Sequence, residues 1–202
     1  MRVHINITYY QNTTMKKRLT YVTSNPHKAS ESLSILRELG IDAEVIHISV
    51  PEIQSDDIIE VASFRAREAY KLLRKPLIVE DAGLFIDALN GFPGPYSSYV
   101  FKTIGISGLL KLMKGIRKRS ATFKSVVAFN DGRRLRIFIG QVKGKISFKP
   151  KGSSWGFDPI FEPRGLNGLT YAQLPLEHKN KVSHRRKALE RAARYLRRWL
   201  NI

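Results

Sequence analysis

The 202-residue sequence predicts an α/β fold with a long, mixed, curved β-sheet, surrounding helices, two lobes and a central cleft. Strand and helix patterns alternate in the first third of the chain, as they do in α/β sheets. Further on, the Asp131-Gly132 pair between two apolar runs predicts a β-hairpin, which adds antiparallel strands to the sheet. An amphipathic helix over residues 184–200 is expected to close the chain.

Three strands and two helices are expected in the first third. Apolar residues at helical spacing predict the helices, and Gly40 is a typical stop for the first of them. The expected apolar face of that helix carries Leu33, Leu36 and Leu39. The expected ranges are a strand at 18–23, a helix at 26–39, a strand at 43–50, a helix at 56–74, and a strand at 77–79 that ends in Glu80-Asp81.

The second part of the chain mixes loops, strands and helices. A glycine- and proline-rich loop at 90–96 precedes a helix near 106–114. The expected strands are 122–130 and 133–140, which form the hairpin, and a separate strand at 142–148. No repeat or linker divides the chain, so residues 15–202 are expected to form a single domain of two lobes. Residues 1–14 read as an N-terminal extension.

Composition limits the classes of function. The chain has no cysteine, which excludes disulfides and thiolate metal sites. No stretch approaches the roughly 18–20 apolar residues that cross a bilayer, and the N-terminus has no secretory pattern. We therefore expect a cytoplasmic protein without a membrane partner. The net charge of +18 would attract a nucleoside triphosphate or a nucleic acid, and a simply basic surface accounts for it equally well.

The segment from Thr23 to Lys28 has the pattern of an anion site. Asn25 is a good helix N-cap and Pro26 a good first helical residue, so the strand leads directly into a helix N-terminus. Free N–H groups at such an end attract anions, and Lys28 adds a positive charge. The same pattern is also typical of an ordinary capped helix with a surface lysine.

Carboxylates follow two of the expected strands. Glu52 comes after Pro51, and Glu80-Asp81 precedes Ala82-Gly83. Ligands of open α/β sheets bind beyond the carboxyl ends of the strands, and carboxylate oxygens suit Mg²⁺. Glu80 and Asp81 point to opposite faces of their strand, so they need not share a role. A surface turn and a helix-flanking acid remain an equally good interpretation.

Two later segments are candidates for base recognition. The loop around Trp155, Gly156 and Phe157 could stack on a purine, although aromatic residues at a strand start are more often core residues. Ser183 is expected to cap the last helix, with His184 and Arg185 in its first turn. Cationic donors there, together with Lys179, would favour 6-oxo purines over adenine. A solvated basic turn would have the same sequence.

In this order and spacing the segments resemble the inosine triphosphate pyrophosphatase family, over roughly residues 19–200. The shared motifs are Thr23-Ser24-Asn25-Pro26-His27-Lys28, Val79-Glu80-Asp81-Ala82-Gly83-Leu84, Asn90-Gly91-Phe92-Pro93-Gly94-Pro95-Tyr96-Ser97, Trp155-Gly156-Phe157-Asp158-Pro159-Ile160-Phe161 and Ser183-His184-Arg185. The resemblance implies Mg²⁺-dependent hydrolysis of ITP, dITP and XTP to the monophosphate and pyrophosphate. It also implies the two-lobed mixed sheet and a homodimer.

The resemblance assigns a role to each candidate. Asp81 is the implied catalytic base, and Glu52 and Asp81 are the implied Mg²⁺ ligands. The implied substrate-binding residues are Thr23, Ser24, Asn25, Lys28, Ala82, Lys102, Trp155, Gly156, Phe157, Asp158, Lys179, His184 and Arg185.

Three features depart from the family pattern. Arg65 stands where lysine is more usual, Gln173 stands where glutamate is usual, and the N-terminal extension has no counterpart. We expect none of the three to touch the metal carboxylates. Two alternatives remain: a related pyrophosphatase for modified pyrimidines, against which the oxo-reading set argues, and a nucleic-acid-binding protein. The chain lacks any recognisable nucleic-acid module, so a specific nucleic-acid partner is not expected.

Overall fold

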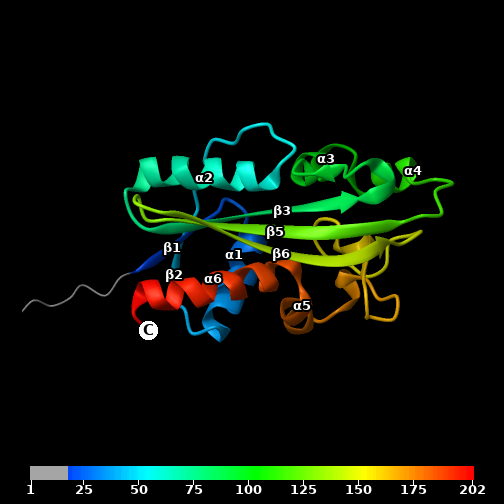
Figure 1. Cartoon of the computed structure of the whole chain (residues 1–202). Coiled ribbons are helices and arrows are strands. Elements are labelled where there is room, and N and C mark those ends of the chain that lie inside the picture. Colours follow the sequence, from blue (N-terminus) through cyan, green and yellow to red (C-terminus); the bar gives the residue numbers. More distant parts are fainter. Residues whose placement is uncertain (1–17) are drawn as a thin grey trace, which may run out of the picture.

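The computed structural model describes residues 18–202, so the expected extension at residues 1–14 lies outside the described residues. The fold class predicted from the sequence is confirmed, because a long mixed sheet carries helices on both faces (Figure 1). No helix within residues 18–202 is long and apolar enough to span a membrane. The elements are β1 (Leu19–Val22), α1 (Pro26–Glu38), β2 (Ala43–Ile46), α2 (Ile58–Leu73), β3 (Leu77–Ile86), η1 (Asp87–Leu89), β4 (Pro93–Gly94), α3 (Ser97–Thr103), α4 (Gly105–Leu112), β5 (Ser120–Asn130), β6 (Leu135–Ile146), η2 (Asp158–Ile160), β7 (Phe161–Pro163), η3 (Tyr171–Gln173), α5 (Leu176–Val182) and α6 (His184–Leu200).

The described residues form one seven-stranded sheet, in the order β2-β1-β3-β5-β6-β7, with β4 paired to β3. β1 lies parallel to both β2 and β3, whereas β5, β6 and β7 add antiparallel pairs. The predicted hairpin at Asp131-Gly132 is confirmed, with Asn130 of β5 opposite Leu135 of β6. The long strands β3, β5 and β6 form a spine along the molecule (Figure 1).

One edge of β3 is shared by two short strands and is open between them. β1 pairs with β3 residues 77–79 and β4 pairs with residues 84–85, whereas β5 pairs with β3 along its whole length on the other edge. Within the described chain, residues 80–83 therefore have no strand partner on the first edge. Because β1 is parallel to β3, its carboxyl end opens into this gap, where α/β sheets bind ligands. The sheet forks at residues 80–83, and this fork positions the site.

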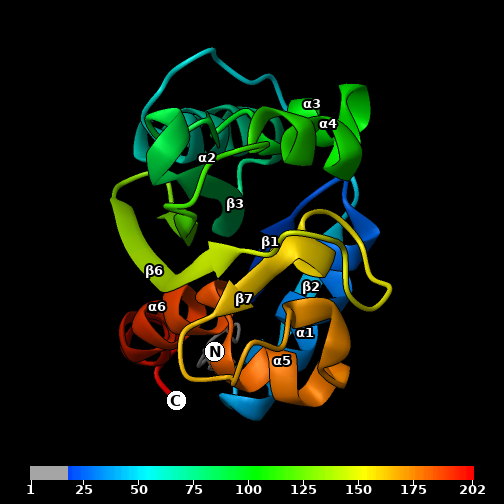
Figure 2. The same ribbon diagram turned by 90° about the vertical axis from the view of Figure 1, so that its right-hand side faces the viewer.

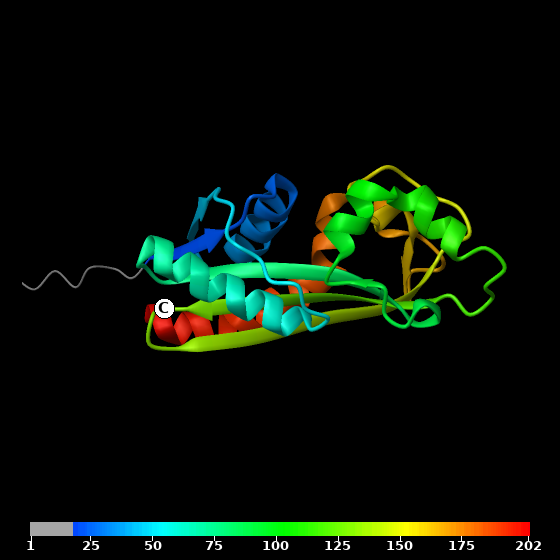
Figure 3. The same cartoon turned by 90° about the horizontal axis from the view of Figure 1, so that it is seen from above.

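Helices cover both faces of the forked sheet. α2 packs on one face over β1, β3 and β5, while α1 and α6 pack on the other, and the two layers lie on opposite sides of the strands (Figure 2). A separate core lies toward the far end of the long strands, where α3, α4, η2, β7 and η3 pack together. Viewed from above, this group and the group of β1, β2 and α1 lie at different places along the spine (Figure 3). They are the two lobes.

Four strand predictions were wrong at their ends. β3 continues to Ile86 instead of ending at Asp81, because antiparallel pairing with β5 supports ten successive residues. The expected strands at 133–140 and 142–148 are one strand, β6. Gly140 does not break it: a Cβ there would lie 2.2 Å from the carbonyl oxygen of His184, so the glycine allows α6 to approach. β2 ends at Ile46, four residues before the expected end.

The helix predictions were mostly confirmed, with two omissions. Helices were expected at 26–39, 56–74 and 184–200, and α1, α2 and α6 occupy these ranges within two residues. The seven-residue helices α3 and α5 were missed. The buried stripe of α1 is also different from the expected leucine face, because its buried residues are Ala29, Glu31, Ser32, Ile35 and Leu36. A buried glutamate in that stripe has a functional explanation, given below.

Candidate active site

A cleft of about 930 Å³ opens at the fork of the sheet, between the two lobes. It brings together every residue that the sequence marked as a candidate. These residues are Thr23, Ser24, Asn25, Lys28, Glu52, Asp81, Ala82, Lys102, Trp155, Gly156, Phe157, Asp158, Lys179, His184 and Arg185. They come from the β1–α1 connection, α1, the 47–57 loop, β3, α3, the 147–157 segment, η2, α5 and α6, so the tertiary fold assembles them from most of the chain.

The carboxyl end of β1 and the start of α1 form a polar corner of the cleft. Asn25 caps α1, and its Oδ1 accepts hydrogen bonds from the backbone N–H groups of His27 (2.9 Å) and Lys28 (3.2 Å). The N–H of Asn25 itself donates to Thr23 Oγ1. Two of the N–H groups that the sequence suggested for an anion are therefore taken by the cap. The helix dipole, Asn25 and the Lys28 side chain remain available to attract one.

Lys28 is held by the buried acid Glu80. Its Nζ donates to the Glu80 carbonyl oxygen at 3.0 Å and lies 3.1 Å from Glu80 Oε2. Burial raises the pKa of Glu80, but the Arg185 and Lys28 cations and a hydrogen bond from Ser125 outweigh it and hold that pKa well below its ordinary value. Glu80 is therefore ionised and serves as an anchor for two cations at the cleft wall.

Asp81 points to the other face of β3, as its neighbouring position requires. Its Oδ1 accepts a hydrogen bond from Nη1 of Arg65, and Nε of the same arginine lies 3.4 Å from Glu52 Oε1. The expectation that Arg65 would not touch the metal carboxylates was wrong. Arg65 is a buried residue of α2 and bridges both of them. Burial lowers the pKa of Arg65, but Asp81 and Glu52 raise it further, so the guanidinium stays charged.

The donor set of Glu52 and Asp81 fits a hard divalent cation that shares its coordination with a substrate. Oδ2 of Asp81 has no hydrogen-bond partner among the described residues, and the Glu52 side chain is 62% exposed. No group of three or more metal-binding side chains occurs within residues 18–202. Mg²⁺ commonly takes one or two protein carboxylates and completes its shell with phosphate oxygens and water. Glu52 and Asp81, in a cleft that lysine and arginine side chains also line, are consistent with this mode of Mg²⁺ binding.

The other end of the cleft contains a buried ionic network. Lys179 Nζ lies 2.6 Å from Glu31 Oε1 and 2.5 Å from Asp158 Oδ2, and Arg185 Nη1 pairs with Glu31 Oε2. These four side chains are 1–6% exposed. The alternative of a solvated basic turn at the start of α6 is therefore wrong. Because the anions already hold the cations in place, their remaining donors have fixed directions.

Two groups of this network retain free hydrogen-bonding capacity. Nη2 of Arg185 and Nδ1 of His184 have no hydrogen-bond partner among the described residues. Burial and the adjacent Arg185 cation lower the pKa of His184 to about 3, so its ring is neutral near neutral pH. The ring is stacked on Phe123, with centroids 4.6 Å apart. A neutral imidazole and a charged guanidinium thus face one pocket.

The two aromatic residues of the glycine loop have different environments. Phe157 is 3% exposed and packs edge-to-face on Phe101, which is the core position that the sequence left open. Trp155 is half-buried, and its Nε1 donates to Glu31 Oε1 at 3.0 Å. Of the two, Trp155 is the ring that offers a surface to a ligand.

Three residues of the site were not predicted from the sequence. Glu31 has no motif of its own, although its spacing of four residues from His27 places both on one face of α1. Arg65 was noted only as a departure, and Glu80 was left without a role. Gln173, the other departure, lies away from the cleft lining: its Oε1 accepts from the Thr170 N–H at 3.1 Å and closes a capping box.

A polar corner, two carboxylates and a buried ionic network line one cleft of this α/β protein. The chain belongs to the Ham1 family, whose model matches residues 19–195. It is 47% identical to a dITP/XTP pyrophosphatase of Thermococcus kodakarensis over 89% of this chain and 97% of that protein. A dITP/XTP pyrophosphatase of Hyperthermus butylicus is also 47% identical, over 88% and 93%. A solved HAM1 protein from Coxiella burnetii superposes with a TM-score of 0.78 at 31% identity, over 90% of this chain and 99% of that one.

Proposed function

We propose that this chain is a nucleoside-triphosphate pyrophosphatase that hydrolyses ITP, dITP and XTP to the monophosphate and pyrophosphate, using Mg²⁺. One observation carries the proposal: the fork of the sheet joins a carboxylate pair, cationic side chains and a half-buried tryptophan within one cleft of about 930 Å³. Curated relatives that cover most of the chain are named for dITP and XTP hydrolysis, which supports the same substrate class.

Glu52 and Asp81 would hold the Mg²⁺ ion, which supplies charge neutralisation to the phosphate oxygens when it is bound. Asn25, Lys28 and Lys102 would bind the triphosphate, together with Thr23, Ser24 and Ala82, which line the same cleft. In binding it, Lys28 would share its charge between Glu80 and a phosphate. The cations thereby offset the negative charge that builds up as the anhydride bond breaks.

The bond-breaking step needs a water molecule and a base. The water oxygen attacks the α-phosphorus, the bond from that phosphorus to the bridging oxygen breaks, and pyrophosphate leaves. Asp81 takes the proton of the water on its carboxylate. Arg65 cannot take this role, because a guanidinium stays protonated. Arg65 instead fixes the Asp81 carboxylate through Oδ1.

Base selection would come from the buried network. Nη2 of Arg185 is a donor without a partner, and a 6-oxo purine offers an acceptor to it. Adenine would present an amino group there and leave the buried donor unpaired, at a cost of about 1–3 kcal/mol for each lost partner. Lys179 and neutral His184 complete the polar edge, with Trp155, Gly156, Phe157 and Asp158 around the ring. This arrangement favours oxo purines over modified pyrimidines.

A nucleotide panel tests the proposal. Purified protein with Mg²⁺ should release pyrophosphate from ITP, dITP and XTP, and little from ATP, when pyrophosphate and orthophosphate are assayed separately. EDTA should stop the reaction and added Mg²⁺ should restore it. Orthophosphate as the first product would place the attack at the γ-phosphorus and contradict the assignment of the cleft.

We further propose that the enzyme acts as a cytoplasmic homodimer, as the family resemblance implies, without a specific nucleic-acid partner. Light scattering at several protein concentrations measures the oligomeric state. Titration with a generic duplex at increasing salt measures any nucleic-acid affinity, which should disappear at moderate salt if it only reflects the charge of +18.

A further inference from the structure

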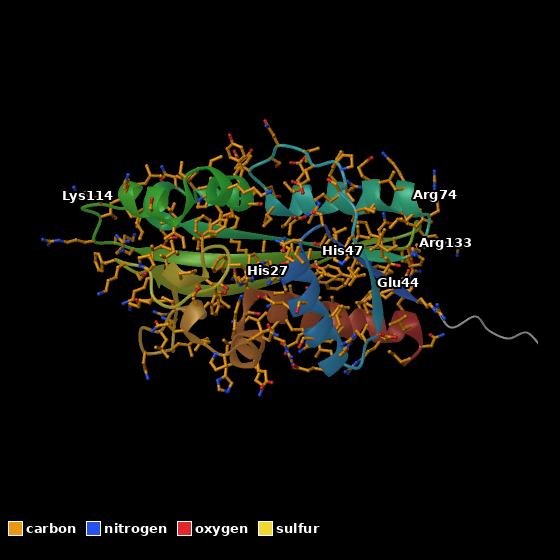
Figure 4. The ribbon with its side chains drawn as sticks, turned by 180° about the vertical axis from the view of Figure 1, so that it is seen from behind. His27, Glu44, His47, Arg74, Lys114 and Arg133 are labelled. Atoms are coloured by element: carbon orange, nitrogen blue, oxygen red, sulfur yellow. The ribbon has the colours of Figure 1, made fainter. Side chains whose placement is uncertain are left out.

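His27 stands at the mouth of the cleft and has no role in the proposed chemistry. It is the second residue of α1 and lines the cleft. Its ring lies on the Trp155 indole with centroids 5.4 Å apart and planes 9° from parallel. Figure 4 shows His27 near the middle of the molecule, far from Lys114 at one end and Arg133 at the other. The stack joins α1 to the segment between β6 and η2.

Helix α1 holds Trp155 at two points, one helical turn apart. His27 covers one face of the indole, and Glu31, four residues later, accepts the hydrogen bond from its Nε1 at 3.0 Å. Residues spaced by four lie on the same face of a helix, so both contacts come from one rigid surface. Trp155 itself belongs to the segment between β6 and η2, on the other side of the cleft.

The two contacts constrain different motions of the indole. The hydrogen bond to Glu31 fixes the position of the ring edge, but it permits the ring to tilt about that edge. A parallel stack with His27 fixes the tilt of the plane. Lys179 Nζ, 5.2 Å from the indole centroid, adds a cation–π contact from the buried network. With His27 in place, the plane of the half-buried indole is set before any ligand binds.

We propose that His27 is a positioning residue for the purine base and acts through Trp155, in a three-layer stack of imidazole, indole and base. The inference rests on the proposed function, because it takes a purine nucleotide as the ligand. The imidazole covers one indole face, and the base would stack on the opposite face, beside the Lys179 and Arg185 cations that lie 5.2 Å and 5.6 Å from the indole centroid. Because His27 already fixes the plane of the indole, less conformational entropy is lost when the ligand binds. His27 should therefore increase affinity without changing the chemical step.

Binding of the product IMP tests this without turnover. His27→Ala should weaken IMP binding about 2- to 10-fold in calorimetry, which is the range expected for one aromatic pair. The KM for ITP should rise by a similar factor while kcat stays within about 2-fold. His27→Phe, which keeps a stacking ring, should restore both values, whereas His27→Lys, which supplies a cation but no ring, should not. His47→Ala removes an exposed histidine that does not line the cleft and serves as the matched control.

Fluorescence gives an independent readout. The chain has two tryptophans, so a Trp199→Phe background leaves Trp155 as the reporter. IMP should change Trp155 emission in that background, and His27→Ala should shift the emission before IMP is added. Tighter IMP binding by His27→Ala would mean that imidazole and base compete for one face, and would overturn the proposal. So would unchanged binding, or rescue by lysine but not phenylalanine. If the parent protein does not hydrolyse ITP, the proposed function has failed instead.

Discussion

Glu31→Gln is expected to destabilise the protein much more than loss of a surface ion pair would. Glu31 is 3% exposed and pairs with Lys179 at 2.6 Å and with Arg185. Its carboxylate belongs to a network of three acids and three bases, which are Glu31, Glu80, Asp158, Lys28, Lys179 and Arg185. Glutamine keeps the shape and one acceptor but leaves the network with one positive charge in excess.

The size of the loss follows from that imbalance. Breaking a buried ion pair by removing one partner typically costs about 3–5 kcal/mol, because a buried charge is left uncompensated. Asp158 and Glu80 still contact the same two cations, so a loss near the lower end, about 3 kcal/mol, is expected. Burial raises the pKa of Glu31, but Arg185 and Lys179 lower it further, so the carboxylate is ionised at neutral pH and the full loss should appear there.

Urea unfolding at neutral pH measures the effect. Glu190→Gln is the matched control, since Glu190 is 44% exposed and forms an ordinary helix pair with Arg186 at 2.7 Å. That variant should lose no more than about 0.5 kcal/mol. Adding Lys179→Met to Glu31→Gln removes the excess charge, so the double variant should lose less than the sum of the singles. Equal losses for Glu31→Gln and Glu190→Gln would refute the assignment of a tightly coupled buried network.

Four further predictions concern chemistry, selectivity, pH and the N-terminus. Asp81→Asn removes the proposed base, so kcat for ITP should fall by more than about 10²-fold; a loss of only a few-fold would remove Asp81 from the mechanism. Arg185→Ala should lower kcat/KM for ITP far more than for ATP, and equal losses would assign Arg185 to folding or phosphate binding. The pKa of His184 is lowered to about 3 in the folded protein, from an ordinary value of 6.5. On acidification, His184 therefore takes up its proton at a higher pH in the unfolded state than in the folded state. The free energy of unfolding should therefore fall by about 1.4 kcal/mol per pH unit between about pH 6 and about pH 4.5, above the range in which carboxylates titrate, and His184→Phe should lack this slope over the same window. Deleting residues 1–14 should leave ITP turnover and the melting temperature unchanged, since the family match begins at residue 19; an insoluble or inactive truncation would assign these residues to the fold.

The sequence determined the local structure wherever one short-range pattern dominates. Asn25-Pro26 fixed the start of α1, Asp131-Gly132 fixed the turn between β5 and β6, and Ser183 fixed the start of α6, where its Oγ accepts from the Arg186 N–H at 3.1 Å. Caps and tight turns depend on residues only a few positions apart, so their sequence patterns are reliable. The candidate site residues came partly from such patterns and partly from a family resemblance.

Only the tertiary structure decided how those residues face one another. The ends of β3 and β6 depend on cross-strand pairing and on Gly140, whose missing side chain allows α6 to pack closely. Neither factor can be recognised from a short stretch of sequence. The bridge from Arg65 to Asp81 and the pairing of Glu31 with Arg185 join residues 16 and 154 positions apart. Ion pairs form between side chains that the fold brings together, whatever their distance in sequence. The sequence therefore named the carboxylates and the cations, and the forked sheet determined which carboxylate holds which cation.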